Sequence, residues 1–578
     1  MSAKSKEIIH PLCFESGSKT GASAVATYFN DPAIRKVVEF FDNKGLKKLK
    51  EEDQSERWYA DWVTYQGENK IFASLLSTKA HSTLGHHFSV LKLTRFMEVI
   101  GYFSPAHGYS LQVSFLGIFP LLMSTNEVLK KEAVETLEKG GLFAFGLSEK
   151  EHGSDIYHNE FKITPAAGGY VGNGKKYYIG NANAASIISI LGRCEADTGN
   201  DEKAKFMFFA LRPSKSPALK NVEKIHTLGV KTAFVGGFEV DQHPFSQGDV
   251  ISEKRAAWDG IFGTVNLGKF FLGFGSIGIC EHALEEALNH TRSRILYGKS
   301  VLQMPHIKSA MSHASARLSG MKLYAYRSLD YLQASSADDR RYLLFNSVMK
   351  AKVSTQGVKV MEGLSECVGA KGFETETYFE SALRDAQLIP GLEGSTHINY
   401  GISLQFLKNY FFQPDARLKS PGSLVLDESL DIENEYLMKA KTGGVKSVRF
   451  PHYLAAYTPL KGIANVHIFT AQIKAFRIFL LGFFAQASLR KEADVVMAMG
   501  KIFSTIAYAQ LISENAHLLN VSEDLVSVVF HQLIEQLSRE AVTLCGLPQI
   551  NLVQRVLIKR MIQMPETEGS AITGILER

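Results

Sequence analysis

The sequence predicts a mainly α-helical protein with a central β domain, because its texture changes twice along the chain. From residue 25 to 141 the pattern is helical, with long mixed segments such as NEVLKKEAVETLEKG and few turn signals. From 142 to 255 the segments are short, rich in aromatic and β-branched residues, and separated by glycine, asparagine or proline. Helical periodicity returns from residue 256.

The second helical block, residues 256–412, contains a helix with the apolar stripe typical of a bundle. Its apolar residues recur at alternating spacings of four and three positions. A connector with proline and glycine, 413–463, leads to a C-terminal helical domain at 464–578, and residues 1–24 form an N-terminal extension. The stripe consists of Ile307, Met311, Ala314, Leu318 and Met321.

Composition indicates an ordinary soluble protein of two to four domains, with 45% hydrophobic and 21% charged residues. A net charge of +5, from 64 basic and 59 acidic residues, is too small to indicate nucleic acid as a partner. The cysteines are five in number and share no CxxC or CxxH spacing, which argues against a zinc site or a disulfide framework. We therefore expect no metal site and a reducing compartment.

The chain begins without the apolar core of a signal peptide, and no window of 18 residues is uninterruptedly apolar. The segment HIFTAQIKAFRIFLLGFFAQA carries Lys474 and Arg477 and is typical of a buried or interfacial helix. A peripheral membrane contact through this helix is the alternative to a place in the core or a subunit interface. We expect a cytoplasmic protein.

Chemistry is concentrated in motifs that occur in the order FAFGLSEKEHGSD, GGYVGNGKKYYIGN, RSRILYGK, CVGAKGF and RDAQLIPGLEGST. In this order and at these separations, they resemble the acyl-CoA dehydrogenase family over residues 90–410. The resemblance implies a helical domain, a small β-barrel and a four-helix bundle, with FAD between domains and assembly as a homodimer or homotetramer. The C-terminal region resembles, in position only, the extra helical domain of the very-long-chain members and of acyl-CoA oxidases.

The first two motifs are candidates for the flavin. A strand is followed by a turn whose backbone N–H groups and hydroxyls suit an anion, although a solvated turn is the alternative. By resemblance the second motif flanks the flavin, but Tyr178 and Gly180 stand where the family usually has Trp and Thr or Ser, so a hydroxyl near flavin N5 is lost. The FAD-binding candidates here are Phe145, Leu147, Ser148, Gly153, Ser154, Tyr178 and Gly180.

In RSRILYGK, a planar guanidinium suits a pyrophosphate. The resemblance implies that Arg294 and Tyr297 reach the FAD of a neighbouring subunit, while Arg292 is better explained as a solvated helix end favoured by the macrodipole. In CVGAKGF, the glycines allow a close backbone approach, although a helix C-cap is the alternative. The family usually has Gln at Glu366 and Gly at Ala370. The further FAD-binding candidates are Glu366, Gly369, Ala370, Ser395 and His397.

Glu393 lies among small and apolar residues, with no Lys or Arg within four positions on either side. By resemblance it aligns with the catalytic base of straight-chain acyl-CoA dehydrogenases. Desolvation raises a carboxylate pKa above its ordinary value of about 4.3, which makes abstraction of an α-proton less uphill. The alternative is a helix N-terminal acid, because Ser395 and Thr396 are capping types. The substrate-binding candidates are Ser154, Lys269, Leu392 and Gly394.

Some family members carry the base on the helix that corresponds to TVNLGKFFLGFG, but this chain has Gly268 there. The sequence therefore predicts an FAD-dependent acyl-CoA dehydrogenase that converts a medium-to-long-chain acyl-CoA to a trans-2-enoyl-CoA in fatty acid β-oxidation. Its expected electron acceptor is an electron-transfer flavoprotein. An acyl-CoA oxidase using oxygen is one alternative. A flavoprotein with a DNA-binding C-terminal domain is another, although the basic residues there are interspersed with acids and no nucleic acid is expected.

Overall fold

The structure is a computed structural model that describes residues 31–194, 200–439 and 444–566. The chain divides into two compact units, and the division lies within helix α9 (Lys254–Ser293). The first unit holds residues 31–275 and 431–439 of the described chain, and the second holds 276–430 and 444–566. The large β sheet therefore belongs to the first unit, and the helices after α9 belong to the second.

The first unit begins with helices that are capped by short polar side chains. The Asp31 carboxylate accepts from Ala33 N at 2.8 Å at the start of the first helix, which breaks at Gly45, where φ is +72°. Such caps satisfy backbone N–H groups that have no partner within the helix. The helices are α3 (Pro32–Gln54), α4 (Ala60–Glu68), α5 (Ile71–Leu76), α6 (Val90–Phe103), α7 (Pro105–Met123) and α8 (Glu127–Glu138).

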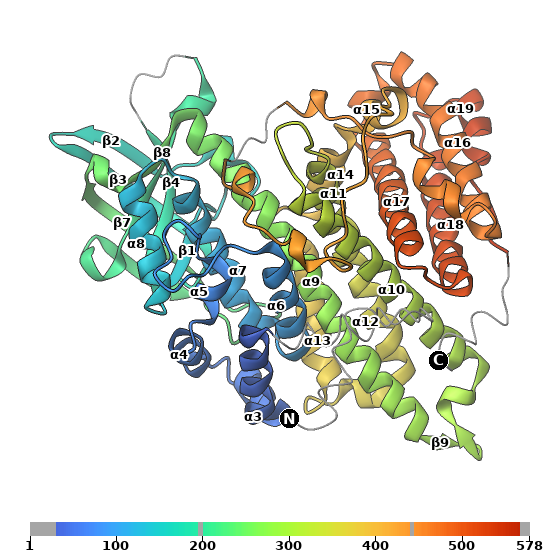
Figure 1. Cartoon of the computed structure of the whole chain (residues 1–578), viewed down its shortest axis with the longest axis horizontal. Coiled ribbons are helices and arrows are strands. Elements are labelled where there is room, and N and C mark those ends of the chain that lie inside the picture. Colours follow the sequence, from blue (N-terminus) through green and yellow to red (C-terminus); the bar gives the residue numbers. More distant parts are fainter. Residues whose placement is uncertain (1–30, 195–199, 440–443, 567–578) are drawn as a thin grey trace. The chain divides into compact units, whose positions relative to one another are not determined.

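An eight-stranded sheet follows these helices (Figure 1). Its order is β6-β7-β3-β2-β4-β5-β8, and β1 pairs with β4 in parallel. Stacked aromatic rings fill its core, as Phe209 and Phe245 do with centroids 4.2 Å apart. The strands are β1 (Leu142–Gly146), β2 (Lys162–Ala166), β3 (Gly169–Gly180), β4 (Ala185–Cys194), β5 (Phe206–Leu211), β6 (Leu219–Lys224), β7 (Val235–Phe245) and β8 (Val250–Glu253).

The second unit opens with a small hairpin of β9 (Ile295–Leu296) and β10 (Lys299–Ser300). Its bundle helices α10 and α12 pack together, and α10 also contacts α17 and α18 of the C-terminal region. Figure 1 shows α16 to α19 gathered into one group. The helices are α10 (Pro305–Gln333), α11 (Tyr342–Val348), a π-helical turn η6 (Met349–Val353), α12 (Ser354–Val368), α13 (Tyr378–Leu388), α14 (Thr396–Leu404), α15 (Leu407–Phe412), α16 (Ala464–Ala485), α17 (Ala493–Leu518), α18 (Glu523–Gly546) and α19 (Leu552–Lys559).

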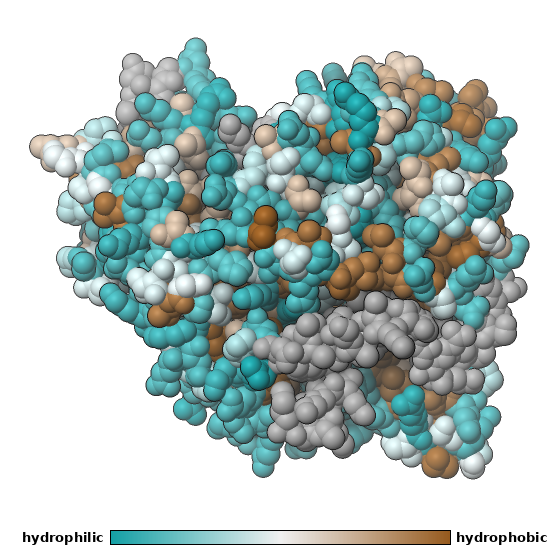
Figure 2. All heavy atoms as spheres, in the orientation of Figure 1, coloured by the Kyte–Doolittle hydropathy of each residue, from teal (hydrophilic) through white to brown (hydrophobic). Residues whose placement is uncertain are grey.

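The predicted fold class is confirmed, since the chain is mainly helical with a central sheet and additional C-terminal helices. Two of these, α16 and α17, are long and apolar enough to cross a membrane by length and composition alone. The apolar window of α17 is 83% buried within the protein and that of α16 is 44% buried. Apolar side chains are also exposed on α19, at Leu552, Val553 and Val556. Figure 2 shows apolar patches on an otherwise mostly hydrophilic face.

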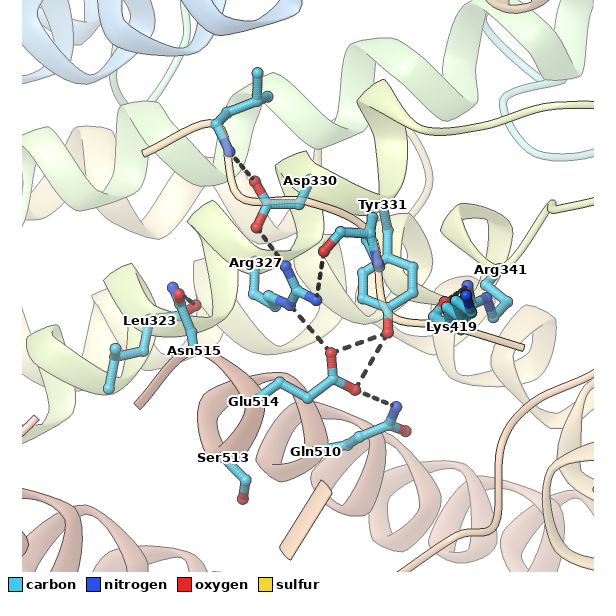
Figure 3. A network of polar contacts seen from close by, with 12 residues as sticks. Leu323, Arg327, Asp330, Tyr331, Arg341, Lys419, Gln510, Ser513, Glu514 and Asn515 are labelled. Atoms are coloured by element: carbon cyan, nitrogen blue, oxygen red, sulfur yellow. Dashed lines mark hydrogen bonds and ion pairs between the residues drawn. The ribbon is translucent and has the colours of Figure 1, made fainter. Parts of the chain in front are cut away.

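A buried ion network joins α10 to α17 (Figure 3). The Arg327 side chain is fully buried and donates from Nη1 to Asp330 Oδ2 at 2.7 Å and from Nε to Glu514 Oε2 at 3.0 Å. The Tyr331 hydroxyl donates to Glu514 Oε2 at 2.9 Å, and Gln510 Nε2 donates to Glu514 Oε1 at 2.9 Å. Burial raises the pKa of Asp330 to about 6, and Arg327 opposes that shift.

The same network holds the connector that follows the bundle. Arg327 Nη2 donates to Pro421 O at 3.1 Å, and Leu424 N donates to Asp330 Oδ1 at 2.8 Å. Arg341 Nη2 donates to Lys419 O at 2.7 Å. The connector is therefore fixed through its backbone to charged groups of the bundle.

We expect Arg327→Met to destabilise the second unit, because it leaves Asp330 and Glu514 buried without their cation. Removing one partner of a buried pair costs about 3–5 kcal/mol of unfolding free energy. Urea denaturation followed by circular dichroism measures the loss. The control is Arg417→Met, since the Arg417 side chain is 90% exposed in its pair with Asp415 and should change little. Equal losses in both variants would contradict the role of the network.

Candidate functional site

The loop after β1, which carries Leu147 and Ser148, is held against β3 by backbone and side-chain contacts. Tyr177 N donates to Ser148 O at 2.9 Å. The buried Lys176 Nζ donates to Leu147 O at 3.2 Å and to Glu149 Oε1 at 2.8 Å. The structure thus brings the Leu147–Ser148 segment of the first motif next to the Tyr178 segment of the second.

Glu149 fixes the far side of this loop. Its carboxylate accepts from Glu160 N at 2.6 Å and from Phe161 N at 3.0 Å, besides the Lys176 amino group. Burial lowers the pKa of Lys176 to about 8, and Glu149 opposes that shift. The ligand atoms of Glu149, His152 and Glu160 lie within 4.8 Å of one another. However, an amino group against Glu149 makes this a poor place for a metal cation.

Tyr178 presents an exposed aromatic ring. Its φ is +62°, a left-handed conformation that is uncommon for a non-glycine residue, and 57% of the residue is exposed. Gly180, two positions later, is buried against α7. A Cβ atom at Gly180 would lie 2.5 Å from Val113 Cγ2, 2.8 Å from Tyr109 Cε1 and 3.1 Å from Tyr109 Oη. Glycine at 180 is therefore explained by the side chains of α7.

Tyr109 is a candidate that sequence reasoning missed. Its hydroxyl lies beside the position where the family usually carries a Thr or Ser side chain. No motif signalled it, because Tyr109 is 71 positions before Gly180 in the chain. The Tyr109 hydroxyl of α7 therefore lies close to the backbone of Gly180 on β3.

The other predicted residues of the first unit lie in different environments. Phe145 is buried within β1, whereas Gly153 and Ser154 are exposed in the loop that follows. Lys269 is buried on α9, directly after Gly268, whose carbonyl accepts from Gln112 Nε2 at 2.8 Å. A glycine in the interior of a helix lowers the stability of that helix. Helix α9 nevertheless contacts α6 closely at its glycines, because a Cβ atom at Gly101 of α6 would lie 2.5 Å from Gly275 O of α9.

Glu393 lies in a turn between α13 and α14, outside both helices. Its φ is +49° and that of Gly394 is +88°, so two successive residues are left-handed. The Glu393 side chain is half-buried, with atom Oε2 enclosed. Ser395 is the N-cap residue of α14 but makes no side-chain cap hydrogen bond. Ser395 therefore does not cap α14 through its side chain, and the alternative of Glu393 as a helix N-terminal acid stays open.

Both sides of this turn are held by buried polar side chains. Lys350 Nζ donates to Ile389 O at 2.5 Å. Asn399 Nδ2 donates to Gly394 O at 2.9 Å and to Ser395 O at 3.1 Å. No Lys or Arg lies within four positions of Glu393 in the sequence. In the folded protein, however, the Lys350 amino group contacts the carbonyl of Ile389, four residues before Glu393.

The predicted residues for the distal part of FAD lie at exposed turns of the second unit. Tyr297 and Gly298 have φ of +52° and +78°, as in a type I′ hairpin, and Tyr297 is 95% exposed. Arg294 is exposed before this hairpin. Gly369 ends α12 with φ +69°. The other candidates Glu366, Ala370 and His397 are also exposed.

Comparisons with known proteins show what the chain and its fold are similar to. A family model described as acyl-CoA dehydrogenase, C-terminal domain, matches residues 258–407. Cyclohex-1-ene-1-carbonyl-CoA dehydrogenase of Geobacter metallireducens is 20% identical over 316 residues, which cover 54% of this chain and 81% of that protein. Glutaryl-CoA dehydrogenase of Desulfococcus multivorans is 23% identical over 378 residues, covering 63% of this chain and 93% of that one.

Among solved structures, an acyl-CoA dehydrogenase of Bacillus anthracis complexed with FAD has a TM-score of 0.70 at 16% identity, covering 94% of this chain and 93% of that one. The fold is thus of the acyl-CoA dehydrogenase class, and the coverage includes the C-terminal helices. Residues 258–407 match the C-terminal domain of the acyl-CoA dehydrogenase family, and the relatives found by sequence are acyl-CoA dehydrogenases. The predicted family is confirmed.

We expect Gly180→Ser to destabilise the first unit, because its Cβ would collide with Val113. Overpacking of this kind costs about 1–3 kcal/mol of unfolding free energy. The measurement is thermal unfolding of the serine variant in the natural chain and in a Val113→Ala background. The loss should be smaller in the Val113→Ala background. An equal loss in both would show that α7 does not dictate glycine here.

Lys176→Met should loosen the loop after β1, since it removes a donor to Leu147 O and the cation of Glu149. The expected loss of unfolding free energy is about 3–5 kcal/mol, and adding Glu149→Gln should recover part of it. Chemical denaturation and limited proteolysis of the loop check both effects. The control is Lys175→Met, whose side chain is 77% exposed. The role of Lys176 is excluded if the two lysine variants behave alike.

Proposed function

We propose that this protein is an FAD-dependent acyl-CoA dehydrogenase with Glu393 as its catalytic base. The observation that carries the proposal is the turn at Glu393. In this turn Glu393 lies outside any helix and has a left-handed backbone conformation. Lys350 and Asn399 hold the turn by hydrogen bonds on its two sides. Backbone strain of this kind is found where geometry serves function.

The residues present fit FAD. The exposed Tyr178 ring offers a face for the flavin, and the loop at Leu147–Ser148 is rigidly supported beside it. When bound, FAD would accept the β-hydrogen of the acyl group as a hydride. The exposed Arg294 guanidinium suits the pyrophosphate. Glu366 is exposed on α12, so the acid that replaces the usual Gln can remain in solvent.

Glu393 would take the proton from the carbon α to the thioester carbonyl. The electron pair of that C–H bond then forms the α,β double bond as the β-hydrogen leaves, so the product is a trans-2-enoyl-CoA. A carboxylate in an apolar, partly dehydrated turn suits this task. Gly394, with no side chain, would leave room for the thioester, and the N–H of Glu393 would stabilise negative charge on the carbonyl oxygen.

The finer features are also proposals. We favour a medium-to-long acyl chain in fatty acid metabolism, although the relatives are named for cyclic and dicarboxylic acyl groups. An electron-transfer flavoprotein is the proposed acceptor, and the cytoplasm the proposed location. Tyr297 is 95% exposed and Phe373 80% exposed. Two such aromatic side chains support a homodimer or homotetramer in which Arg294 and Tyr297 meet the FAD of another subunit.

The test is an anaerobic titration of the flavin-loaded protein with acyl-CoAs that differ in length, together with glutaryl-CoA and cyclohexanecarbonyl-CoA. We expect bleaching of the flavin absorbance by a preferred chain length. Glu393→Gln should slow it by at least about a hundredfold, because loss of a catalytic acid–base group costs about 10²–10⁴-fold. Glu376→Gln, an exposed acid outside the site, is the control. Undiminished bleaching in Glu393→Gln would refute the assignment, and rapid reoxidation in air would favour an oxidase.

A further inference from the structure

Lys350 is fully buried in the π-helical turn η6, between α11 and α12. Burying an amino group is costly unless it makes hydrogen bonds. Its Nζ donates to Ile389 O at 2.5 Å, across a sequence separation of 39 positions. π-helical turns are rare and occur frequently at functional sites. A buried lysine in such a turn therefore needs an explanation beyond packing.

The carbonyl that Lys350 contacts begins the turn that carries Glu393. Ile389 O also accepts from Leu392 N at 3.1 Å, which closes the 3₁₀ turn Ile389–Gly391. Leu392 is then extended, with ψ of 150°, and Glu393 follows with φ of +49°. The direction in which the Glu393 side chain leaves the backbone thus depends on the turn that Lys350 holds.

Lys352 lies in the same π-helical turn and is equally buried, but it has a different partner. Its Nζ donates to Thr505 Oγ1 of α17 at 2.9 Å and lies 5.6 Å from the centroid of the Tyr508 ring. The two lysines share a structural element and a degree of burial. They differ in that Lys350 contacts the turn of Glu393, whereas Lys352 contacts the C-terminal helices.

We propose that Lys350 is a positioning residue for Glu393, which aims its carboxylate at the substrate without contacting the substrate. This inference rests on the proposed function. Lys350 fixes the turn before Glu393, and Asn399 fixes it afterwards through Gly394 O. A displacement of a catalytic base by about 1 Å can lower the reaction rate by about a hundredfold. Substrate affinity depends on other contacts and should change little.

The experiment compares Lys350→Met, Lys350→Arg and Lys352→Met in the flavin-loaded full chain. Anaerobic stopped-flow bleaching gives the rate at saturating acyl-CoA and the apparent Kd. A 3-thia-acyl-CoA, whose β-methylene is replaced by sulfur, isolates loss of the α-proton from hydride transfer and is followed by its long-wavelength charge-transfer absorbance. Circular dichroism and unfolding of each variant show whether it folds.

We expect Lys350→Met to lower the bleaching rate by at least about tenfold and to weaken the charge-transfer absorbance at saturation, with Kd within about twofold. Lys350→Arg keeps a donor at a different length and should recover part of both signals. Lys352→Met should lose stability but keep the bleaching rate within about twofold, because it does not touch the turn.

The proposal is overturned if Lys350→Met keeps the natural rate and charge-transfer signal, or if Lys352→Met loses as much. Should Lys350→Met not fold, Lys350→Gln decides, because its side chain is shorter and loses the contact with Ile389 O, and an unchanged rate there would also overturn the proposal. Failure of the proposed function is distinguishable. It appears as bleaching that survives Glu393→Gln, whatever the lysine variants do.

Discussion

The second unit depends on a single buried guanidinium, that of Arg327. Two carboxylates and one backbone carbonyl surround it, and they come from α10, α17 and the connector. A buried charge is tolerated only when its partners are in place, so the network makes α17 an integral part of the bundle. This matters for the site, because α17 packs closely on α14, where a Cβ at Gly500 would lie 2.8 Å from Tyr400 Cβ. Helix α14 begins directly after the turn of Glu393.

In the first unit the comparable constraint is close approach between backbones. A Cβ at Gly117 of α7 would lie 2.6 Å from Ala144 N of β1, and Gly101 meets Gly275 at a similar distance. At these two contacts the neighbouring backbone leaves no space for a side chain at the glycine. Gly180 differs from these contacts, because a Cβ there would meet side chains of α7, those of Val113 and Tyr109, and not backbone. Its departure from the usual family residue is therefore a consequence of packing by α7, and Tyr109 brings a hydroxyl to the same place.

The sequence predicted what depends on local periodicity and on motifs. The strand-rich segment and the helical bundle were predicted from residues close together in the chain, and Glu393 was chosen in the same way as a candidate base, which stays a prediction. What it could not predict are partnerships between distant segments. Glu393 was described by its neighbours along the chain, and the contact of Lys350 with Ile389 spans 39 positions. Tyr109 and Gly180 meet in the same way. Neither Lys350 nor Tyr109 lies in a motif, so only tertiary packing reveals them.

The two buried lysines of the π-helical turn contact different parts of the second unit, and Lys352 reaches the C-terminal helices beyond residue 407, where the family model ends. Lys352 reaches Thr505 of α17, and Lys350 reaches Ile389 before the base. One extra residue in a helical turn reorients the side chains around it. In η6 the amino groups of Lys350 and Lys352, two positions apart, reach different neighbours. The Glu393 turn and the C-terminal helices thus each receive a separate buried donor from one short segment, so the contact of Lys350 with the turn does not run through α17.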